Sequence, residues 1–503
     1  MLLAIKVQGH VINGEHKAQQ SSAYIDVINP ANGEIVAQTT AGTAEEVDKA
    51  VAAAKAAFPG WRSTPASERA ALIARIALVL GANLEELIEL ECSCTGILAS
   101  RMASFDVPAL MQIIQTFAEN LEDYPFVEYP PVRTLPEAHD VKVFKEPLGV
   151  CGLISPWNAP LFVTFVKMIP ALAAGNTVVI KPSESSSVAI VRVAELLQSI
   201  LPPGVVNVVT GYGHEAGAAL VAHPDVAKIS FTGSTNTGRM IQRTAADTMK
   251  RVTLELGGKG AGIALPDAPI ELTARGATFA FLFHAGQVCI SGTRLFIHES
   301  IHDQVVARMV HLAEALKPGG QFDPQTTLAP MAFKAHYDRV MGYIDSAKEQ
   351  GATLVCGGEP MVVPGAPESL FIQPTIFTDV TDDMRIYREE IFGPVLSVIK
   401  YSDVDDAIRM ANDSCYGLSA GVWSGDPIAA QSIARQLEAG TVWVNEWHAL
   451  TGDVSFGGMK QSGYGREINM ASIESYLESK TYLTSFETDP AAKALQGLLH
   501  QAV

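Results

Sequence analysis

Residues 177–210, TVVIKPSESSSVAIVRVAELLQSILPPGVVNVVT, contain the pattern that decides the fold. Two short runs rich in β-branched residues, 177–181 and 205–210, flank a helical stretch at 187–200. The alternation continues with a helix near 214–222, a strand at 227–232, a helix at 236–248 and a strand at 251–256. Strands of about five residues that alternate with helices of about 10–15 residues predict βαβ units and a parallel sheet.

The same alternation resumes after Gly258 and predicts a second α/β unit. A helix at 269–285 precedes a strand at 293–298, and further helices and strands follow, with a Pro-rich surface loop expected at 359–370. Upstream, the apolar spacing predicts helices at 43–58, with a capping-box pattern at Thr43 and Glu46, and at 66–91. We therefore expect an α/β protein with two Rossmann-like units that meet near residue 258.

Two extended stretches, 125–147 and the tail from 471, fit neither unit. They are punctuated by Pro or Tyr and have two equally open interpretations. Either they pair as strands that leave the body, as elements that join protomers often do, or they are surface loops.

The composition and the net charge exclude several classes of function. The chain has 503 residues, of which 48% are hydrophobic, so it contains ample core for a globular protein. Its formal net charge is −18, from 36 Lys and Arg against 54 Asp and Glu. This negative charge repels phosphates, so we expect neither nucleic acid nor an anionic membrane surface as a partner. No apolar run reaches the length of about 18 residues that a membrane span needs.

Six cysteines, scattered from residue 92 to residue 415, are too few for a disulfide scaffold and indicate a reducing compartment, with the cytoplasm expected. We predict no metal site. Residues 298–302, HESIH, match a zinc-protease pattern that needs both histidines on one helix. Here His298 ends an expected strand, and Ser300 with Asp303 predicts that the helix begins after it.

Three polar residues lie near the ends of expected strands or helices, where ligands of parallel sheets bind. Cys289 ends a long apolar helix and is either a reactive thiolate or an inert buried cysteine. Glu255, flanked by leucines, is either a partly desolvated base or a member of a salt bridge. Asn158 either donates to an oxyanion or caps a turn.

Seven strings resemble motifs of the aldehyde dehydrogenase superfamily, in the family's order and over nearly the whole chain. They are PWNAPL at 156–161, KPSE at 181–184, FTGST at 231–235, LELGGK at 254–259, GQVC at 286–289, EEIFGPV at 389–395 and SFGGMKQSGYGRE at 455–467. One such string is a weak signal, whereas seven at compatible spacings are specific. The resemblance implies NAD(P)-dependent oxidation of an aldehyde to a carboxylic acid.

By this resemblance, Cys289 is the nucleophile that forms a thiohemiacetal and then, after hydride transfer, a thioester. The Asn158 side chain and the Cys289 backbone N–H match the donors to the oxyanion. Glu255 matches the general base that activates water to hydrolyse the thioester. Because branches that transfer the acyl group to coenzyme A typically lack this glutamate, we expect hydrolytic release. The alternative is a semialdehyde or coenzyme A-acylating dehydrogenase of the same fold.

The resemblance also implies the cofactor contacts. These are Trp157, Lys181, Ser183, Glu184, Gly233, Ser234, Gly257, Glu390 and Phe392. Lys181 and Glu184 match residues that bind the adenosine ribose, and a carboxylate there repels a 2′-phosphate, so we expect NAD, with NADP possible. Ser234 precedes a helix whose N-terminus can hold the pyrophosphate. Glu390 and Phe392 match residues at the nicotinamide ribose and ring.

The predicted substrate tunnel is lined by Val163, Val166, Phe283, Val288, Ile290, His448 and Phe456. It is mainly apolar, and no arginine is apparent that could hold a substrate carboxylate. We therefore expect aliphatic or aromatic aldehydes rather than succinate semialdehyde. Val166, where relatives often have a larger residue, predicts room for a larger aldehyde. His448 either faces the tunnel mouth or packs within a surface loop.

The resemblance divides the chain into three parts. Residues 1–124 and 148–257 form the expected NAD-binding domain, 258–470 the catalytic domain, and 125–147 with 471–503 a small β oligomerisation element and tail. We expect a homodimer or homotetramer that acts on a small-molecule aldehyde. A non-enzymatic role of the same fold is a third possibility, and the intact Cys289, Glu255 and Asn158 speak against it.

Overall fold

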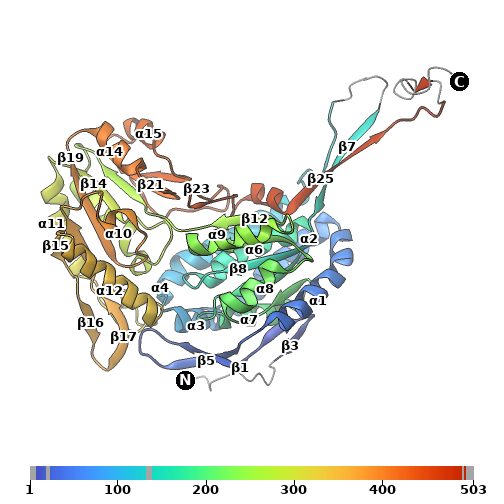
Figure 1. Cartoon of the computed structure of the whole chain (residues 1–503), viewed down its shortest axis with the longest axis horizontal. Coiled ribbons are helices and arrows are strands. Elements are labelled where there is room, and N and C mark those ends of the chain that lie inside the picture. The colour runs from blue at the N-terminus through green and yellow to red at the C-terminus, as the bar shows by residue number, and fades with distance from the viewer. Residues whose placement is uncertain (1–6, 18–22, 132–138, 490–491, 494–503) are drawn as a thin grey trace.

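The computed structural model describes residues 7–17, 23–131, 139–489 and 492–493. Two sheets, each flanked by helices, form the two halves of the body, and a narrow β arm leaves one half (Figure 1). Both sheets consist mainly of parallel strands. The predicted α/β fold with two such units is therefore confirmed.

The first sheet has the strand order β24-β12-β11-β8-β9-β10-β2-β3. Its central, parallel strands are β8 (Val150–Ser155), β9 (Thr177–Pro182), β10 (Val206–Val208), β11 (Val226–Thr232) and β12 (Arg251–Glu255). Most of their side chains are buried, because helices cover both faces, which explains why these strands are continuous apolar runs in the sequence. Its antiparallel edges are β2 (His10–Ile12), β3 (Glu15–Lys17) and β24 (Gly463–Tyr464).

The helices of this half follow the predicted signals with one correction. Helix α1 (Ala44–Ser63) begins with the predicted capping box, in which the Thr43 N–H donates to the Glu46 carboxylate at 2.9 Å. The stretch expected as one helix at 66–91 is two helices, because Asn83 leaves helical geometry between them. The other helices are α2 (Ala66–Ala82), α3 (Leu84–Thr95), α4 (Ala99–Arg101), α5 (Val107–Asn120), α6 (Pro160–Ala174), α7 (Val188–Leu197), α8 (Ala218–Ala222) and α9 (Thr235–Ala246).

The second sheet has the strand order β15-β18-β19-β14-β13-β21-β22 and is parallel apart from β15. Its strands are β13 (Ala261–Ala264), β14 (Arg294–His298), β15 (Thr353–Cys356), β18 (Thr375–Thr378), β19 (Val395–Tyr401), β21 (Ser419–Trp423) and β22 (Thr441–Val444). Its helices are α10 (Ile270–Leu282), α11 (His302–Glu314), α12 (Lys334–Glu349), α13 (Arg385–Arg388), α14 (Val404–Asn412) and α15 (Pro427–Ala434). His298 ends a strand and His302 begins a helix, so the HESIH string lacks the geometry of a zinc protease.

Two β features differ from the expectations. The stretch 359–370 is not a loop but the hairpin of β16 (Pro360–Val363) and β17 (Ala366–Ile372), because Gly365, with φ at 81°, permits a tight turn between them. A sheet of β1 (Val7–Gln8), β5 (Ile35–Thr40) and β4 (Tyr24–Ile28) near the N-terminus was not predicted. The alternating exposed and buried residues of β4 are the signal that marks such a strand.

Three short strands lie between the two halves. They are β20 (Tyr416–Gly417), β23 (Met459–Lys460) and β24. In β24, Gly463 pairs with Glu255 of β12, at the edge of the first sheet. The range 258–470, predicted for the second domain, thus contains a strand that returns to the first sheet. Both halves therefore contribute backbone around Glu255.

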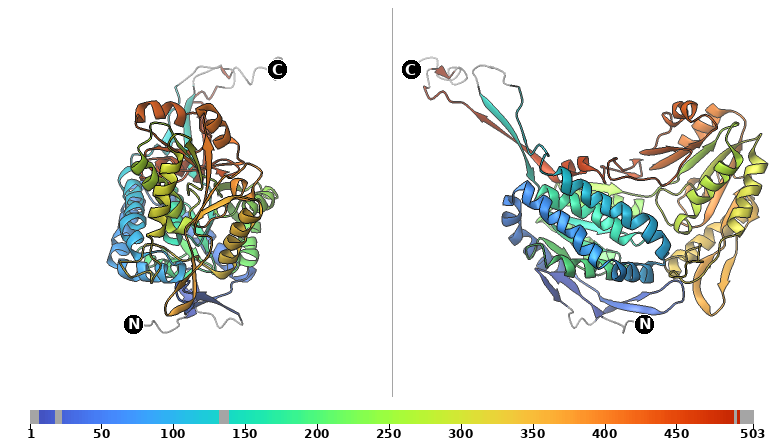
Figure 2. Two further views of the ribbon diagram at one scale, coloured as in Figure 1. Left: turned by 90° about the vertical axis from the view of Figure 1, so that its left-hand side faces the viewer. Right: turned by 180° about the vertical axis from the view of Figure 1, so that it is seen from behind.

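The arm consists of β7 (Asp140–Pro147) and β25 (Leu477–Thr484), which pair antiparallel along their whole length. A short strand, β6 (Val127–Glu128), pairs with the middle of β7, at Val143 and Phe144. Of the two interpretations of these stretches, the structure has the paired strands, and the arm projects from the body in every view (Figure 2). Residues 132–138, 490–491 and 494–503 of the predicted element lie outside the described residues.

Candidate active site

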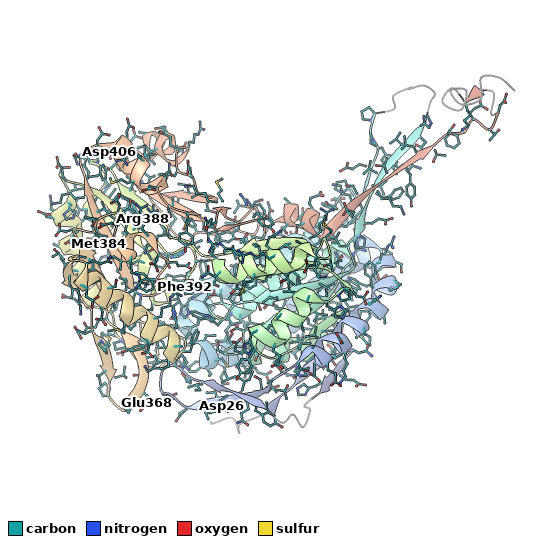
Figure 3. All side chains as sticks on the ribbon, viewed as in Figure 1. Asp26, Glu368, Met384, Arg388, Phe392 and Asp406 are labelled. Carbon is teal, nitrogen blue, oxygen red and sulfur yellow. The ribbon has the colours of Figure 1, made fainter. Side chains whose placement is uncertain are left out.

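Two cavities meet at Cys289. A cleft of about 890 Å³ lies between the halves, with Trp157 and Ser234 on one side and Phe392 on the other. Figure 3 shows Phe392 at this position, between the helices α9 and α12. A narrow tunnel continues from the cleft, and Cys289 and Asn158 line both cavities. A ligand in either cavity can therefore reach the same thiol.

The structure brings most of the predicted site residues to these two cavities. The tunnel is lined by Asn158, Glu255 and Cys289 and by Val163, Val166, Phe283, Val288, Ile290, His448 and Phe456. The cleft is lined by Trp157, Gly233, Ser234, Gly257, Glu390 and Phe392. Lys181, Ser183 and Glu184 are not part of this lining; they lie at the end of β9 and in the turn after it.

A strained turn carries Cys289, where a helix was expected to continue to residue 285. Helix α10 ends at Leu282, and a 3₁₀ turn (Phe283–Gly286) follows, in which His284 and Ala285 have φ values of 52° and 51°. Left-handed residues other than glycine cost about 1–3 kcal/mol each, so the surrounding structure must impose this geometry. Because of this turn, the Cys289 side chain lies at the junction of the two cavities and not on the face of a helix.

The buried side chain of Gln287 holds this turn in place. Its Nε2 donates to the Pro330 carbonyl at 2.9 Å, and its Oε1 accepts from the Ala332 N–H at 2.9 Å. The Asn158 Nδ2 donates to the Gln287 carbonyl at 2.9 Å, which fixes the amide beside the thiol and leaves its second N–H free of this bond. Gln287 was not predicted as a site residue, although it stands within the GQVC string.

The thiol of Cys289 is neutral in the resting site. Burial, together with the nearby carboxylates of Glu390 and Glu255, raises its pKa to about 12. The backbone N–H groups of Cys289 and Ile290 act in the opposite direction, because they stabilise negative charge on the sulfur. The thiol therefore needs a proton acceptor before it can act as a nucleophile.

Glu255 ends β12 with its carboxyl group buried against the tunnel. Neither carboxyl oxygen has a hydrogen-bond partner among the described residues. Burial and the charge of Glu467 raise its pKa well above the ordinary value, and Lys167 opposes this only in part. Lys167 is instead paired with Glu467 at 2.6 Å. A buried, unpaired carboxyl with a raised pKa is typical of a group that transfers protons.

Aromatic rings line both sides of the cleft. The Trp157 ring lies edge-on to Phe392 and Phe333, with centroids 5.4 and 5.3 Å away. Phe392 has a left-handed φ of 64°, and its carbonyl is bonded by His336 Nε2 at 2.7 Å. These edge-on contacts join Trp157 on one side of the cleft to Phe392 and Phe333 on the other.

Glu390 connects the Phe392 side of the cleft to the catalytic strand. Its Oε1 accepts from the Gly258 N–H at 2.8 Å, while its backbone carbonyl accepts from Arg339 at 2.7 Å. Burial raises the pKa of its carboxyl group to about 7. A Cβ atom on Gly257 would collide with this carboxyl group, so the close approach requires glycine.

The opposite end of the cleft can hold anionic groups. Ser234 caps α9 by accepting from the Thr237 N–H, and the remaining N–H groups of this first turn face an open helix end. Lys181, nearly buried, contacts the Glu184 carboxylate at 3.3 Å. These groups are a helix N-terminus, a lysine, a carboxylate and glycine backbone. Their chemistry suits a dinucleotide, because the N–H groups and the lysine can bind phosphates and the carboxylate can accept from ribose hydroxyls.

His448 lines the tunnel and is also packed, so both predicted environments apply to it. Its ring contacts those of Phe283 and Phe279, and Nε2 lies 3.2 Å from the Ala280 carbonyl. Burial lowers its pKa to about 3, so the ring is neutral. With Val166 and Phe456, it forms an uncharged part of the tunnel wall.

One arginine, which the sequence analysis did not identify, lines the tunnel. Arg101, paired with Asp106, lines it together with the unpredicted residues Phe105, Phe162, Leu450, Glu467 and Ile468. Arg101 ends α4, and a π-helical turn (Met102–Asp106) follows it. Such turns often occur at functional sites, but no simple residue pattern marks them, and Arg101 lies far from every recognised string.

Comparison with known proteins agrees with this geometry. The model of the aldehyde dehydrogenase family matches residues 16–482. The chain belongs to the aldehyde dehydrogenase family. It is 41% identical to aldehyde dehydrogenase 1A1 of Homo sapiens, covering 93% of each chain, and 40% identical to hydroxyisobutyraldehyde dehydrogenase of Mycolicibacterium austroafricanum, covering 96% of this chain and 95% of that one. An NAD⁺ complex of the Bacillus cereus aldehyde dehydrogenase superposes with a TM-score of 0.92 at 37% identity, covering 95% and 97% of the two chains.

Family membership identifies the chain as an NAD-dependent oxidoreductase that acts on aldehydes, as the seven strings predicted. None of the helices in the described part of the chain has the length and apolarity needed to cross a membrane. Within the same residues, no group of three or more His, Cys, Asp or Glu side chains could hold a metal ion.

Proposed function

We propose that this aldehyde dehydrogenase oxidises apolar aliphatic or aromatic aldehydes to carboxylic acids, with Cys289 as nucleophile and hydrolytic release of the product. The observation that carries the proposal is the junction of the two cavities. There, Cys289 and Asn158 face both the cofactor cleft and the tunnel, while Glu255 faces the tunnel. An aldehyde in the tunnel thus meets the thiol on one side and the cofactor on the other.

The first step is attack of the Cys289 sulfur on the aldehyde carbon, which forms a thiohemiacetal oxyanion. Because the pKa of the thiol is about 12, its proton must pass to an acceptor during attack, and the ionised form of Glu255, an unpaired carboxylate that also lines the tunnel, is the acceptor that we assign. The Asn158 amide and the Cys289 N–H stabilise the oxyanion, since both are held in place before the substrate arrives.

When bound in the cleft, the oxidised NAD supplies the hydride acceptor. Loss of hydride from the thiohemiacetal carbon leaves a thioester on Cys289. After Glu255 has released the thiol proton to solvent, it takes a proton from a water molecule, whose oxygen attacks the thioester. That proton then passes to the leaving Cys289 sulfur, which releases the carboxylic acid and restores the free thiol. The raised pKa of Glu255 suits this role, because the strength of a base increases with the pKa of its conjugate acid.

The cleft residues take separate parts in cofactor binding. Lys181 and Glu184 would hold the adenosine ribose, with Ser183 in the turn between them, and the Glu184 carboxylate favours NAD over NADP. Gly233 and Ser234 would present the start of α9 to the pyrophosphate.

The nicotinamide half would lie against Gly257, Trp157, Glu390 and Phe392, which line the same part of the cleft. A Gly257→Ala variant, whose methyl group would collide with Glu390, is therefore expected to weaken NAD binding.

Steady-state turnover tests hydrolytic release. With hexanal and NAD, and without coenzyme A or phosphate, we expect continuous NADH formation and one hexanoate per NADH. A single burst of NADH that resumes only when coenzyme A is added would show an acyl-transferring enzyme instead.

We also propose that the arm joins copies of the chain into a homodimer or homotetramer. It exposes apolar side chains far from the body, Tyr482 at 43% and Leu483 at 65%, as expected of a surface that another protomer covers. All six cysteines are free thiols, and the catalytic one must stay reduced, so we place the enzyme in a reducing compartment, the cytoplasm. Light scattering of the intact chain tests the assembly.

A further inference from the structure

A third cavity adjoins the end of the tunnel that lies away from the cleft. It has a volume of about 920 Å³ and is lined mainly by apolar side chains such as Leu98, Phe279 and Leu316. Arg101 and Phe283 line both this cavity and the tunnel. The two side chains stack, with the Arg101 Cζ 4.5 Å from the centre of the Phe283 ring. They form the wall that the far end of an aldehyde must meet.

Asp106 completes this wall by forming an ion pair with Arg101. The Arg101 Nη2 donates to Asp106 Oδ1 at 2.8 Å, and Nε lies 2.8 Å from Oδ2, so the two groups meet side by side. Both side chains are more than nine-tenths buried. Arg101 Nη1 has no hydrogen-bond partner among the described residues. The charge of the arginine is thus balanced within the wall.

Most other ionisable groups around the tunnel are also balanced or neutral. Glu467 is paired with Lys167, and burial together with the charge of Glu467 raises the pKa of the catalytic carboxyl Glu255. His448 is neutral, as described above, and behind the wall burial raises the pKa of Glu91 to about 8, so Glu91 is mainly protonated at neutral pH. Apart from the catalytic carboxyl of Glu255, the tunnel therefore has no uncompensated charge for a charged substrate to pair with.

We propose that the Arg101–Asp106 pair is a specificity determinant that restricts the tunnel to aldehydes whose distal end is uncharged. A substrate carboxylate in contact with Arg101 would also contact Asp106, and a substrate ammonium group in contact with Asp106 would also contact Arg101. Neither gains enough attraction to offset the loss of its hydration in a buried site. Removing the charge of Asp106 should therefore admit a substrate carboxylate, and removing the charge of Arg101 should admit a substrate ammonium group. This inference rests on the proposed function, since it concerns the substrate of the same site.

The test compares three aldehydes of similar length: hexanal, adipate semialdehyde and trimethylaminobutyraldehyde. In the unaltered enzyme with NAD, we expect kcat/KM for hexanal to exceed both charged substrates by at least about 100-fold, because an unpaired buried charge costs more than the 2.8 kcal/mol that this factor represents. Asp106→Asn should raise the ratio of adipate semialdehyde to hexanal by at least about tenfold, and Arg101→Met should do the same for trimethylaminobutyraldehyde.

The matched control is Asp225→Asn, which removes one member of the exposed Lys55–Asp225 pair and should leave all three ratios within about twofold. If Asp106→Asn or Arg101→Met fails to reach the melting temperature of the parent enzyme, Asp106→Glu or Arg101→Lys takes its place. These substitutions keep both charges but misalign the pair. The kcat/KM ratio of either charged aldehyde to hexanal should then rise at least about threefold.

Unchanged ratios in folded variants, or charged aldehydes oxidised as fast as hexanal by the parent enzyme, would overturn the role of the pair. Failure of the parent enzyme to oxidise any of the three would instead overturn the proposed function.

Discussion

The cofactor cleft and the substrate tunnel share Cys289 and Asn158 but satisfy their polar groups in different ways. In the cleft, the Glu390 carboxyl accepts from the Gly258 N–H, and Ser234 is bonded to its own helix. In the tunnel, both oxygens of Glu255 lack a partner among the described residues. The cleft is thus organised to hold one large ligand, whereas the tunnel keeps a reactive carboxyl in an apolar environment.

This difference assigns separate tasks to the two regions. Polar groups that already have partners cost little to keep and fix the position of a bound molecule. An unpaired buried carboxyl costs stability, and proteins retain such groups where proton transfer needs them. Variants on the tunnel side should therefore reduce the rate of chemistry, while variants on the cleft side should change cofactor affinity or choice.

The largest effect is expected for Cys289→Ala, which removes the group that the two cavities share. Without the nucleophile no thioester forms, so NADH formation from hexanal should fall by at least about 10⁴-fold. NAD binding, followed by calorimetry, should persist, because the cleft keeps its own contacts. Cys415→Ala, at an exposed thiol, is the control and should retain turnover. Substantial activity of the Cys289→Ala enzyme would remove Cys289 from the mechanism.

The next effect is expected for Glu255→Gln. General-base catalysis contributes about 10²–10⁴-fold, and hydrolysis of the thioester should slow by that factor while hydride transfer continues for one turnover. Stopped-flow measurement should thus show a burst of one NADH per active site. Added hydroxylamine should restore turnover, since it attacks the thioester without a general base.

The control for this experiment is Glu91→Gln, which changes a carboxyl that is buried as deeply but does not line the tunnel. It keeps an acceptor for the Leu161 N–H, so turnover should continue without a burst. A Glu255→Gln enzyme with normal steady-state rates would place the base elsewhere.

Asn158→Ala tests whether the shared amide acts on the reaction or only on the turn. Loss of one oxyanion donor costs about 10²–10³-fold in kcat, and KM for NAD should change little. If Asn158 served only to hold the Gln287 carbonyl, the melting temperature would fall and the remaining folded enzyme would keep its kcat.

The cofactor cleft could be predicted from the sequence in more detail than the substrate tunnel. The cleft depends on local strings such as FTGST and EEIFGPV, in which a helix start or a short turn already contains the needed groups, so its residues could be assigned one by one. Arg101 and Asp106 could not, because their position in the tunnel depends on a π-helical turn and on packing against Phe283, about 180 residues away in the chain.

The turn at Cys289 shows the same limit at short range. The sequence around His284 and Ala285 continues the apolar helix pattern, and only tertiary contacts of Gln287 force the left-handed geometry. Helix length was therefore overestimated close to the catalytic residue. The βαβ alternation, which depends on burial, was predicted for β9 to β12 of the first sheet, whereas β13 of the second sheet was not predicted.

The pH dependence of the reaction should separate the tunnel carboxyl from the cleft carboxyl. Glu255 must be ionised to act as a base, and its pKa is raised well above the ordinary value, so hydrolysis should accelerate as pH increases, about tenfold per unit while pH stays below that pKa. Glu255→Gln should abolish this slope. Stopped-flow rates of thioester hydrolysis from about pH 6 to about pH 9 measure it. A slope that survives in Glu255→Gln would assign it to another group, with Glu390, whose pKa is about 7, as the first candidate.

The smallest effect is expected on the cleft side, where Glu184 sets the choice of cofactor. Its carboxylate is half exposed and lies 3.3 Å from Lys181, so a 2′-phosphate at this position would meet a negative charge that water screens in part. Glu184→Ser should therefore raise the kcat/KM ratio of NADP to NAD by only about tenfold, while the single-turnover rate with saturating cofactor stays the same. Lys181→Met provides the opposing variant, since loss of the lysine should weaken both cofactors alike. If Glu184→Ser instead slowed hydride transfer at saturation, the cleft would control chemistry as well as binding, and the division between the two regions would not hold.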